Sequence, residues 1–126
     1  MNNMRRLMVV GALTIGTLGL AASPAFASSH TSSAPGGAGK TTYNTSNNHY
    51  QIYDTKGDHR AVAVQFYRPG QPSALVGFQS CHEGAGDNCP GDLPRSVTGP
   101  LCMQTGVGLG PNPTGYTFGR ESCFNA

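Results

Sequence analysis

The sequence predicts a small, mainly β domain stabilised by disulfides, either a sandwich or an open barrel. Apolar and polar residues alternate in several short stretches, and these stretches are separated by segments rich in Gly and Pro. Beyond residue 27, no window of 11 or more residues combines helical periodicity with freedom from Gly and Pro, so we expect little or no helix. Short strands joined by such turns are typical of both architectures, and the pattern does not choose between them.

The first 27 residues have the three regions of a secretory signal peptide in the required order. Arg5 and Arg6 are followed by an uncharged, apolar run over 7–22, and a site of small residues ends at Ala27. The apolar run is shorter than the roughly 20 residues that a membrane-spanning helix needs. We therefore expect cleavage after Ala27, secretion, and an extracellular protein that begins at Ser28; the alternative is an uncleaved membrane anchor.

Cleavage would also change the charge of the protein. The whole chain has a formal net charge of +2, and loss of Arg5 and Arg6 would leave a neutral domain. The remaining basic residues are scattered singly, at Lys40, Lys56, Arg60, Arg68, Arg95 and Arg120. Because nucleic-acid and anionic membrane partners require clustered positive charge, we predict neither kind of partner for the mature protein.

Composition divides the mature chain into two parts. Residues 28–42 contain no large apolar side chain and are rich in Ser, Gly and Thr, so we expect a flexible leader. Residues 43–126 are expected to form one β domain, since chains of this size fold as single domains.

The strongest strand signals lie in the first half of that domain. Residues 49–54 and 60–67 alternate, and 74–80 resume the pattern after a turn at Arg68–Pro72. We expect these three strands to form a β-meander. In 60–67, the side chains of Val62, Val64 and Phe66 should face the core, and those between them should be partly exposed to water. In 74–80, Val76 and Phe78 are expected to be the inward pair.

The second half carries weaker signals. We expect a long loop over 81–95 and an irregular segment over 106–113, because both are rich in Gly and Pro. Short strands are expected at 96–98, 101–105 and 116–119.

Four cysteines lie in the mature chain: Cys81, Cys89, Cys102 and Cys123. An even number in a small exported domain indicates two disulfides, for which three pairings are possible. We favour 81–89, which closes a short loop, and 102–123, which ties down the C-terminal segment. The alternative is a metal site that includes His82, but the spacing lacks the paired C-x-x-C arrangement of structural zinc sites. We predict neither a metal nor a cofactor.

The segment Tyr53 to Arg60, followed at once by an alternating strand, resembles a hairpin turn of small secreted bacterial disulfide-containing β proteins of uncharacterised function. A pair of cysteines near the C-terminus, here Cys102 and Cys123, adds to the resemblance. The long segment between Cys81 and Cys89 and the lack of tryptophan depart from that group. The resemblance implies secretion and a β fold, and it implies no particular chemistry.

For function, we expect a non-catalytic binding or inhibitory module that acts on an extracellular protein or polysaccharide through the bridged loop. A preorganised loop on a stable scaffold loses little entropy on docking. The candidate contact residues are Arg68, Leu93 and Arg95.

Two other functions remain open. A small secreted hydrolase could use His82, Glu83 and Asp87 as acid and base. A structural or surface-assembly protein could associate through exposed tyrosines, for which the candidates are Tyr43, Tyr50, Tyr53 and Tyr67.

Overall fold

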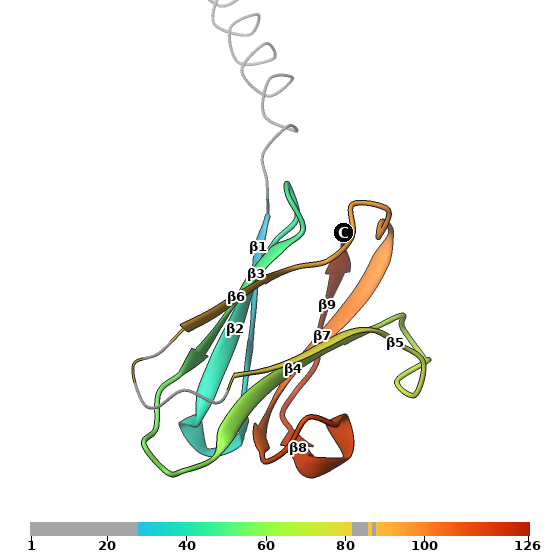
Figure 1. The fold of residues 1–126 in the computed structure, drawn as a ribbon. Helices are drawn as coiled ribbons and strands as arrows, with labels where there is room; N and C mark the ends of the chain where they lie inside the picture. The colour runs from blue at the N-terminus through green and yellow to red at the C-terminus, as the bar shows by residue number, and fades with distance from the viewer. Residues whose placement is uncertain (1–27, 82–85, 87) are drawn as a thin grey trace, which may run out of the picture.

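Two antiparallel sheets pack face to face as a β-sandwich, so the predicted fold class is confirmed (Figure 1). The computed structural model describes residues 28–81, 86 and 88–126. The first sheet has the strand order β1-β2-β3-β6, formed by β1 (Ser29–Ser33), β2 (Gly39–Asn44), β3 (His49–Asp54) and β6 (Asn88–Asp92). The second has the order β5-β4-β7-β8 with β9 also paired to β7, formed by β4 (Ala61–Tyr67), β5 (Leu75–Cys81), β7 (Pro100–Gly108), β8 (Tyr116–Phe118) and β9 (Ser122–Asn125). Two single turns of 3-10 helix are described, η1 (Pro35–Gly37) and η2 (Pro113–Gly115).

The main hydrophobic core lies between the two sheets. The first sheet contributes two tyrosines and an isoleucine, and the second contributes aliphatic side chains and a phenylalanine from β4 and β7. The largest fully buried apolar side chains in this cluster are those of Tyr43, Phe66, Ile52, Leu101 and Met103. Burying that apolar area drives the packing of one sheet on the other.

Strand β4 is buried on both faces, which corrects the expectation of a partly wetted face. Val62, Val64 and Phe66 face the main core as expected, whereas Ala61 and Ala63 pack in a second cluster on the outer side of the sheet. That second cluster contains Phe78, Tyr116 and Phe118. The sequence of β4 alone does not reveal that distant aromatic rings cover its outer face.

Strand β5 is irregular, and this corrects the expected inward pair. Its register with β4 shifts at the step from Phe66 to Tyr67, which places a bulge in the ladder. Val76 therefore packs against the main core while Phe78 packs on the outer cluster.

Residues 28–42, expected to be a flexible leader, form β1, η1 and much of β2. Small side chains allow this, since Ala34 and Ala38 are buried against Val107. Gly39 is required at its position: a Cβ atom there would lie 2.4 Å from Tyr53 O and 2.8 Å from both methyl groups of Val62. The lack of large apolar residues, which predicted disorder, instead permits a close approach between the sheets.

Buried hydroxyls add a second reason for that order. Thr105 Oγ1 donates a hydrogen bond to Thr41 Oγ1 at 2.9 Å and lies within hydrogen-bonding distance of Ser32 Oγ. Ser32, Thr41 and Thr105 are 3%, 0% and 0% exposed. These three residues, named here the hydroxyl cluster, join β1 and β2 of one sheet to β7 of the other.

The prediction that 49–54, 60–67 and 74–80 form a meander is wrong for the connection between 49–54 and 60–67, which do not pair. Strand β3 pairs with β2 and β6, while β4 pairs with β5 and β7, so the chain crosses from one sheet to the other between Asp54 and Ala61. The segment that resembles a hairpin turn is this crossover. Both edges of β3 are already paired, which leaves no place for β4 beside it. The N-terminal meander is instead β1-β2-β3.

Two further boundaries differ from expectation. Strand β7 continues to Gly108, and its residues Gly106 and Gly108 pair with β8. Glycine permits this close pairing, since a Cβ atom at either position would collide with β8 or the residue before it. Residues 96–98 form no strand, and β6 occupies part of the expected 81–95 loop.

Both favoured disulfide pairings are present. Cys81–Cys89 joins β5 to β6 and so links one edge of the second sheet to an edge of the first. Cys102–Cys123 joins the neighbouring strands β7 and β9. A hydrogen bond from Gln79 to Pro90 O and a stack of His30 on Phe124 hold the sandwich closed along its two edges.

Within the described residues, no helix is long and apolar enough to span a membrane.

Candidate functional site

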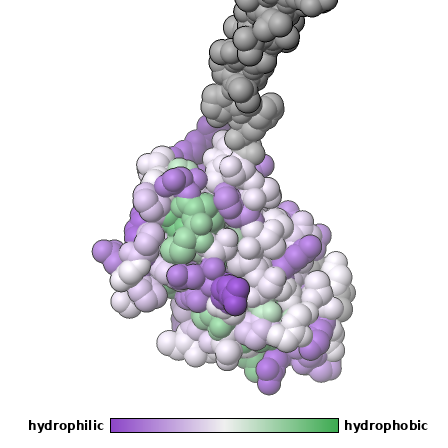
Figure 2. All heavy atoms as spheres, turned by 180° about the vertical axis from the view of Figure 1, so that it is seen from behind, coloured by the Kyte–Doolittle hydropathy of each residue, from purple (hydrophilic) through white to green (hydrophobic). Residues whose placement is uncertain are grey.

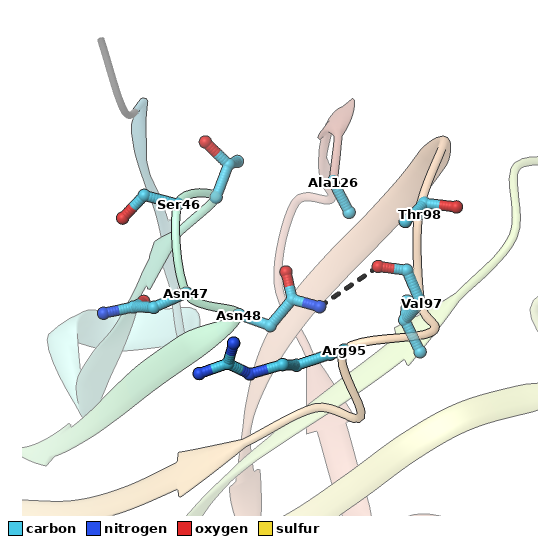
Figure 3. Close-up of a pocket in the computed structure, with 8 residues that line it drawn as sticks. Ser46, Asn47, Asn48, Arg95, Val97, Thr98 and Ala126 are labelled. Atoms are coloured by element: carbon cyan, nitrogen blue, oxygen red, sulfur yellow. Dashed lines mark hydrogen bonds between the residues drawn. The ribbon is translucent and has the colours of Figure 1, made fainter. Parts of the chain in front are cut away.

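A pocket of about 300 Å³ lies at one end of the sandwich, where the β2–β3 turn meets the segment that precedes β7 (Figure 3). We name it the Asn48 pocket. Its lining residues come from these two segments and from the residue that follows β9: Thr45, Ser46, Asn47, Asn48, Arg95, Val97, Thr98 and Ala126. The pocket is therefore assembled from residues distant in sequence, and the paired strands beneath hold them in place.

The β2–β3 turn is fixed by its own side chains. The carboxamide oxygen of Asn44 accepts hydrogen bonds from the backbone N–H and the hydroxyl of Ser46, at 2.9 and 2.7 Å. The carboxamide oxygen of Asn47 accepts from the backbone N–H of His49 at 3.0 Å. Such side-chain contacts to nearby backbone groups are typical of Asn in tight turns. They give one wall of the pocket a defined shape.

Asn48 forms the floor of the pocket. Its φ of 55° lies in the left-handed region, which Asn tolerates better than most residues. The residue is 7% exposed, and its Nδ2 donates to Pro94 O at 3.0 Å and to Val97 O at 3.1 Å. Within the described structure its Oδ1 accepts no hydrogen bond, and in Figure 3 this oxygen points into the space between the turn and Ala126. A donor of a ligand can therefore reach this carbonyl oxygen from the pocket.

Arg95 supplies the charge of the site. Its side chain is exposed and extends beneath Asn48 toward the β2–β3 turn (Figure 3). The close contact between a basic group and a carboxylate within the described residues joins His49 Nδ1 to Asp92 Oδ1 at 2.9 Å. The guanidinium of Arg95 has no carboxylate partner there. The pocket therefore offers a cation with several donor N–H groups beside the free carboxamide oxygen of Asn48.

The three predicted contact residues have different roles. Arg95 lines the pocket. Arg68 donates through Nη1 to Thr98 O at 2.7 Å and Pro100 O at 2.8 Å, and it thereby anchors the loop that forms the second wall. Leu93 is 6% exposed in the main core, so its side chain is not available to a partner, and this expectation is corrected.

The structure describes the tyrosines predicted for an assembly surface, but not the residues predicted for a hydrolase. His82, Glu83 and Asp87 lie outside the described residues. Of the tyrosines expected on an assembly surface, Tyr43, Tyr50 and Tyr67 are buried, which corrects that expectation. Tyr53 is half-buried with the ammonium of Lys40 5.2 Å from its ring centroid.

The chemistry of the pocket favours binding. Its lining residues carry hydroxyl groups, carboxamides, one guanidinium and small apolar groups. The Ser46 hydroxyl is oriented by Asn44, which cannot act as a base. Elsewhere in the described chain, Cys102, Glu121 and Cys123 have potential ligand atoms within 4.8 Å of one another, but both sulfurs are in a disulfide and cannot ligate a metal.

A second hollow lies at the opposite end of the sandwich. It is a groove made by two adjoining pockets that share Arg60, Val107 and Thr117. Leu109, 62% exposed, lies on its rim. The face turned away from the view of Figure 1 is mixed, with small hydrophobic areas separated by hydrophilic side chains (Figure 2). We name this hollow the Arg60 groove.

Comparison with protein-family models, curated proteins and solved structures finds no match for this chain.

Sequence reasoning missed Asn48 and the hydroxyl-bearing residues of the pocket. The stretch from 43 to 48 is polar and indicates a turn, and two adjacent asparagines in it are a signal for left-handed backbone. The burial of Asn48 depends on carbonyl groups 46 and 49 residues away, so no local pattern could reveal it.

Proposed function

We propose that this protein is a secreted, non-catalytic binding module that holds a polar group of an extracellular macromolecule in the Asn48 pocket. The observation that carries the proposal is the free Oδ1 of Asn48 beside the unpaired guanidinium of Arg95. One group accepts and the other donates, so together they can orient a polar ligand.

The frame around the pocket supports binding. Two paired strands, the Asn44 and Asn47 turn contacts and the Arg68 anchor hold both walls before any ligand arrives. Preorganised walls reduce the entropy lost on association, which otherwise costs about 0.5–1.5 kcal/mol for each immobilised flexible side chain.

Secretion is part of the same proposal. It rests on the order of charged, apolar and small residues over 1–27 and on two disulfides, which persist in oxidising compartments. Intact-mass measurement of protein from the culture medium tests it. A chain that begins at Ser28 and offers no thiol to an alkylating reagent before reduction is expected, and retention of residues 1–27 would contradict secretion by cleavage.

The binding function is tested by capture from the extracellular fraction of the producing cells. Immobilised mature protein is compared with Arg95→Ala and with Arg60→Ala, a matched loss of one exposed arginine at the opposite end. We expect a retained macromolecule that is lost with Arg95→Ala and kept with Arg60→Ala. Retention lost only with Arg60→Ala would move the site to the Arg60 groove and overturn the proposal.

A further inference from the structure

We propose that the Cys102–Cys123 disulfide is a site of covalent modification by low-molecular-weight thiols, which attack the sulfur of Cys123. Cys123 is exposed, whereas Cys102 is 1% exposed. Exposed disulfides are the labile ones, and exchange begins when a thiolate reaches one of the two sulfurs. The difference in exposure therefore makes Cys123 the sulfur that is attacked and Cys102 the one that leaves. This site is independent of the proposed binding function.

The exchange reaction needs no reactant besides the external thiol. Its thiolate forms a new disulfide bond with Cys123 Sγ, and the bond between Cys123 and Cys102 breaks. The electron pair of that bond leaves on Cys102 Sγ, which takes a proton from water. The product is a mixed disulfide at Cys123 with a free thiol at Cys102. Attack by the Cys102 thiolate on Cys123 reverses the reaction, since it releases the external thiol and restores the bridge.

The Cys81–Cys89 disulfide is less accessible. Cys81 is 1% exposed and lies in the main core, and Cys89 is partly buried and packs against the same core. Attack on either sulfur requires part of that packing to open first. The reactivity of a cysteine sulfur depends on its exposure, so the two disulfides should react at different rates.

Strand β9 has enough other contacts to stay in place when its disulfide opens. It forms a ladder of four residue pairs with β7, and two backbone hydrogen bonds join Ala126 to Gly99 beyond that ladder. The ring of Phe124 stacks on His30, and its centroid lies 4.9 Å from that of the Tyr43 ring. These contacts keep the two sulfurs adjacent, so the bridge re-forms as an intramolecular step and the exchange does not require unfolding.

The carboxylate of Glu121 should slow the opening of this bridge. One of its oxygens lies within 4.8 Å of both sulfurs, and the phenol of Tyr67 donates a hydrogen bond to the carboxylate. A negative charge at this distance raises the free energy of the Cys102 thiolate, and a poorer leaving group slows thiol–disulfide exchange. Removal of the charge should therefore speed the reaction.

Timed exposure of the folded mature protein to 2-mercaptoethanol tests the site. Free thiols are blocked with iodoacetamide at intervals, and peptide masses show which cysteines are alkylated, carry the added thiol or remain bridged. We expect Cys102–Cys123 to open faster than Cys81–Cys89 by a factor of about ten or more, with the added thiol on Cys123 and a rate proportional to thiol concentration. The proposal is overturned by the added thiol on Cys102, by comparable rates for the two bridges, or by a rate independent of thiol concentration, which would mean that unfolding comes first.

Two variants separate the charge of Glu121 from its hydrogen bond. Glu121→Gln removes the charge, whereas Tyr67→Phe removes the hydrogen bond and keeps the charge. We expect Cys102–Cys123 to open roughly threefold faster or more in Glu121→Gln, and no faster in Tyr67→Phe. An equal increase in both variants, or none in Glu121→Gln, would overturn the role of the charge, while the peptide masses decide the site itself.

Discussion

At the scale of single residues, this protein places polar groups in the interior and gives nearly all of them partners. Asn48 combines an unusual backbone conformation with two hydrogen bonds to carbonyl groups of the segment that precedes β7. Tyr67 donates to the carboxylate of Glu121 from a position that is 2% exposed. These contacts suggest that specific polar pairs, as well as apolar area, fix the positions of the loops.

The two hydrogen bonds of Asn48 can be tested apart from its backbone conformation. Asn48→Gly keeps a residue that adopts positive φ at no cost and removes both bonds. We expect the free energy of unfolding to fall by about 1–3 kcal/mol, because the buried hydrogen bond to Val97 O and the partly buried one to Pro94 O are both lost. Urea denaturation measures it, with Ser73→Gly as the control, since Ser73 is an exposed loop residue whose side chain makes no hydrogen bond within the described structure. An equal loss in both variants would mean that glycine entropy, rather than the hydrogen bonds, sets the effect.

Tyr67 should make the stability of the protein fall at alkaline pH. Burial raises the pKa of its phenol, and the hydrogen bond to Glu121 and the charge of that carboxylate raise it further. Burial likewise raises the pKa values of Tyr43, Tyr50 and Tyr116. When the pKa of a tyrosine is higher in the folded than in the unfolded protein, its contribution to stability is at its maximum at pH values below the ordinary pKa of 10.0. The stability it contributes is lost as the pH rises beyond 10.0 toward the folded pKa.

Spectrophotometric titration of the phenols checks this expectation. Glu121→Gln removes the charge and keeps the size of the side chain, so one tyrosine should ionise at lower pH than in the unaltered protein while remaining above 10.0 because it is still buried. Asp58→Asn, a carboxylate in the crossover from β3 to β4, is the control. A titration curve that Glu121→Gln leaves unchanged would remove Glu121 as a cause.

At the scale of elements, the alternation of apolar and polar residues predicted the positions of the strands well, but it did not predict which strands pair. The stretch 49–54 is β3, and 60–67 and 74–80 differ from β4 and β5 by one residue at their ends. The connection from β3 to β4 was not predictable, because a short turn suits a hairpin and a crossover equally. Likewise β1 and β2 owe their order to the hydroxyl cluster and to close packing at Gly39, both of which depend on residues far along the chain.

The hydroxyl cluster should account for part of that order. Thr105→Val keeps the shape of the side chain and removes the hydroxyl, so the buried hydroxyls of Ser32 and Thr41 lose their shared partner. We expect a loss of about 1–3 kcal/mol in unfolding free energy. Hydrogen exchange should become faster in β1 and β2. Thr117→Val, at an exposed position of β8, is the matched control; similar exchange in both variants would contradict a role for the cluster in holding β1.

At the scale of the whole molecule, the sandwich is closed along two edges by side chains. One edge brings β5 and β6 together through Cys81–Cys89 and the Gln79 hydrogen bond, and the other brings β1 near β9 and β7. The Asn48 pocket lies at one end of this closed frame and the Arg60 groove at the other. Of the pocket, the sequence indicated Arg95 and the turn beside it, while the burial of Asn48 could be found only once the sheets were assembled.

The two disulfides should therefore make different contributions to the frame. Replacing both members of either pair by Ser removes a crosslink over 8 or 21 residues, and the chain-entropy model gives a loss of about 3 kcal/mol for each. Cys102 and Cys123 lie on strands that remain hydrogen-bonded, so their double variant should lower stability without local opening. Cys81 and Cys89 join strands of different sheets, so their double variant should also lose hydrogen-exchange protection in β5 and β6. Equal protection in those strands for the two double variants would show that Gln79 and the core hold that edge without the Cys81–Cys89 bridge.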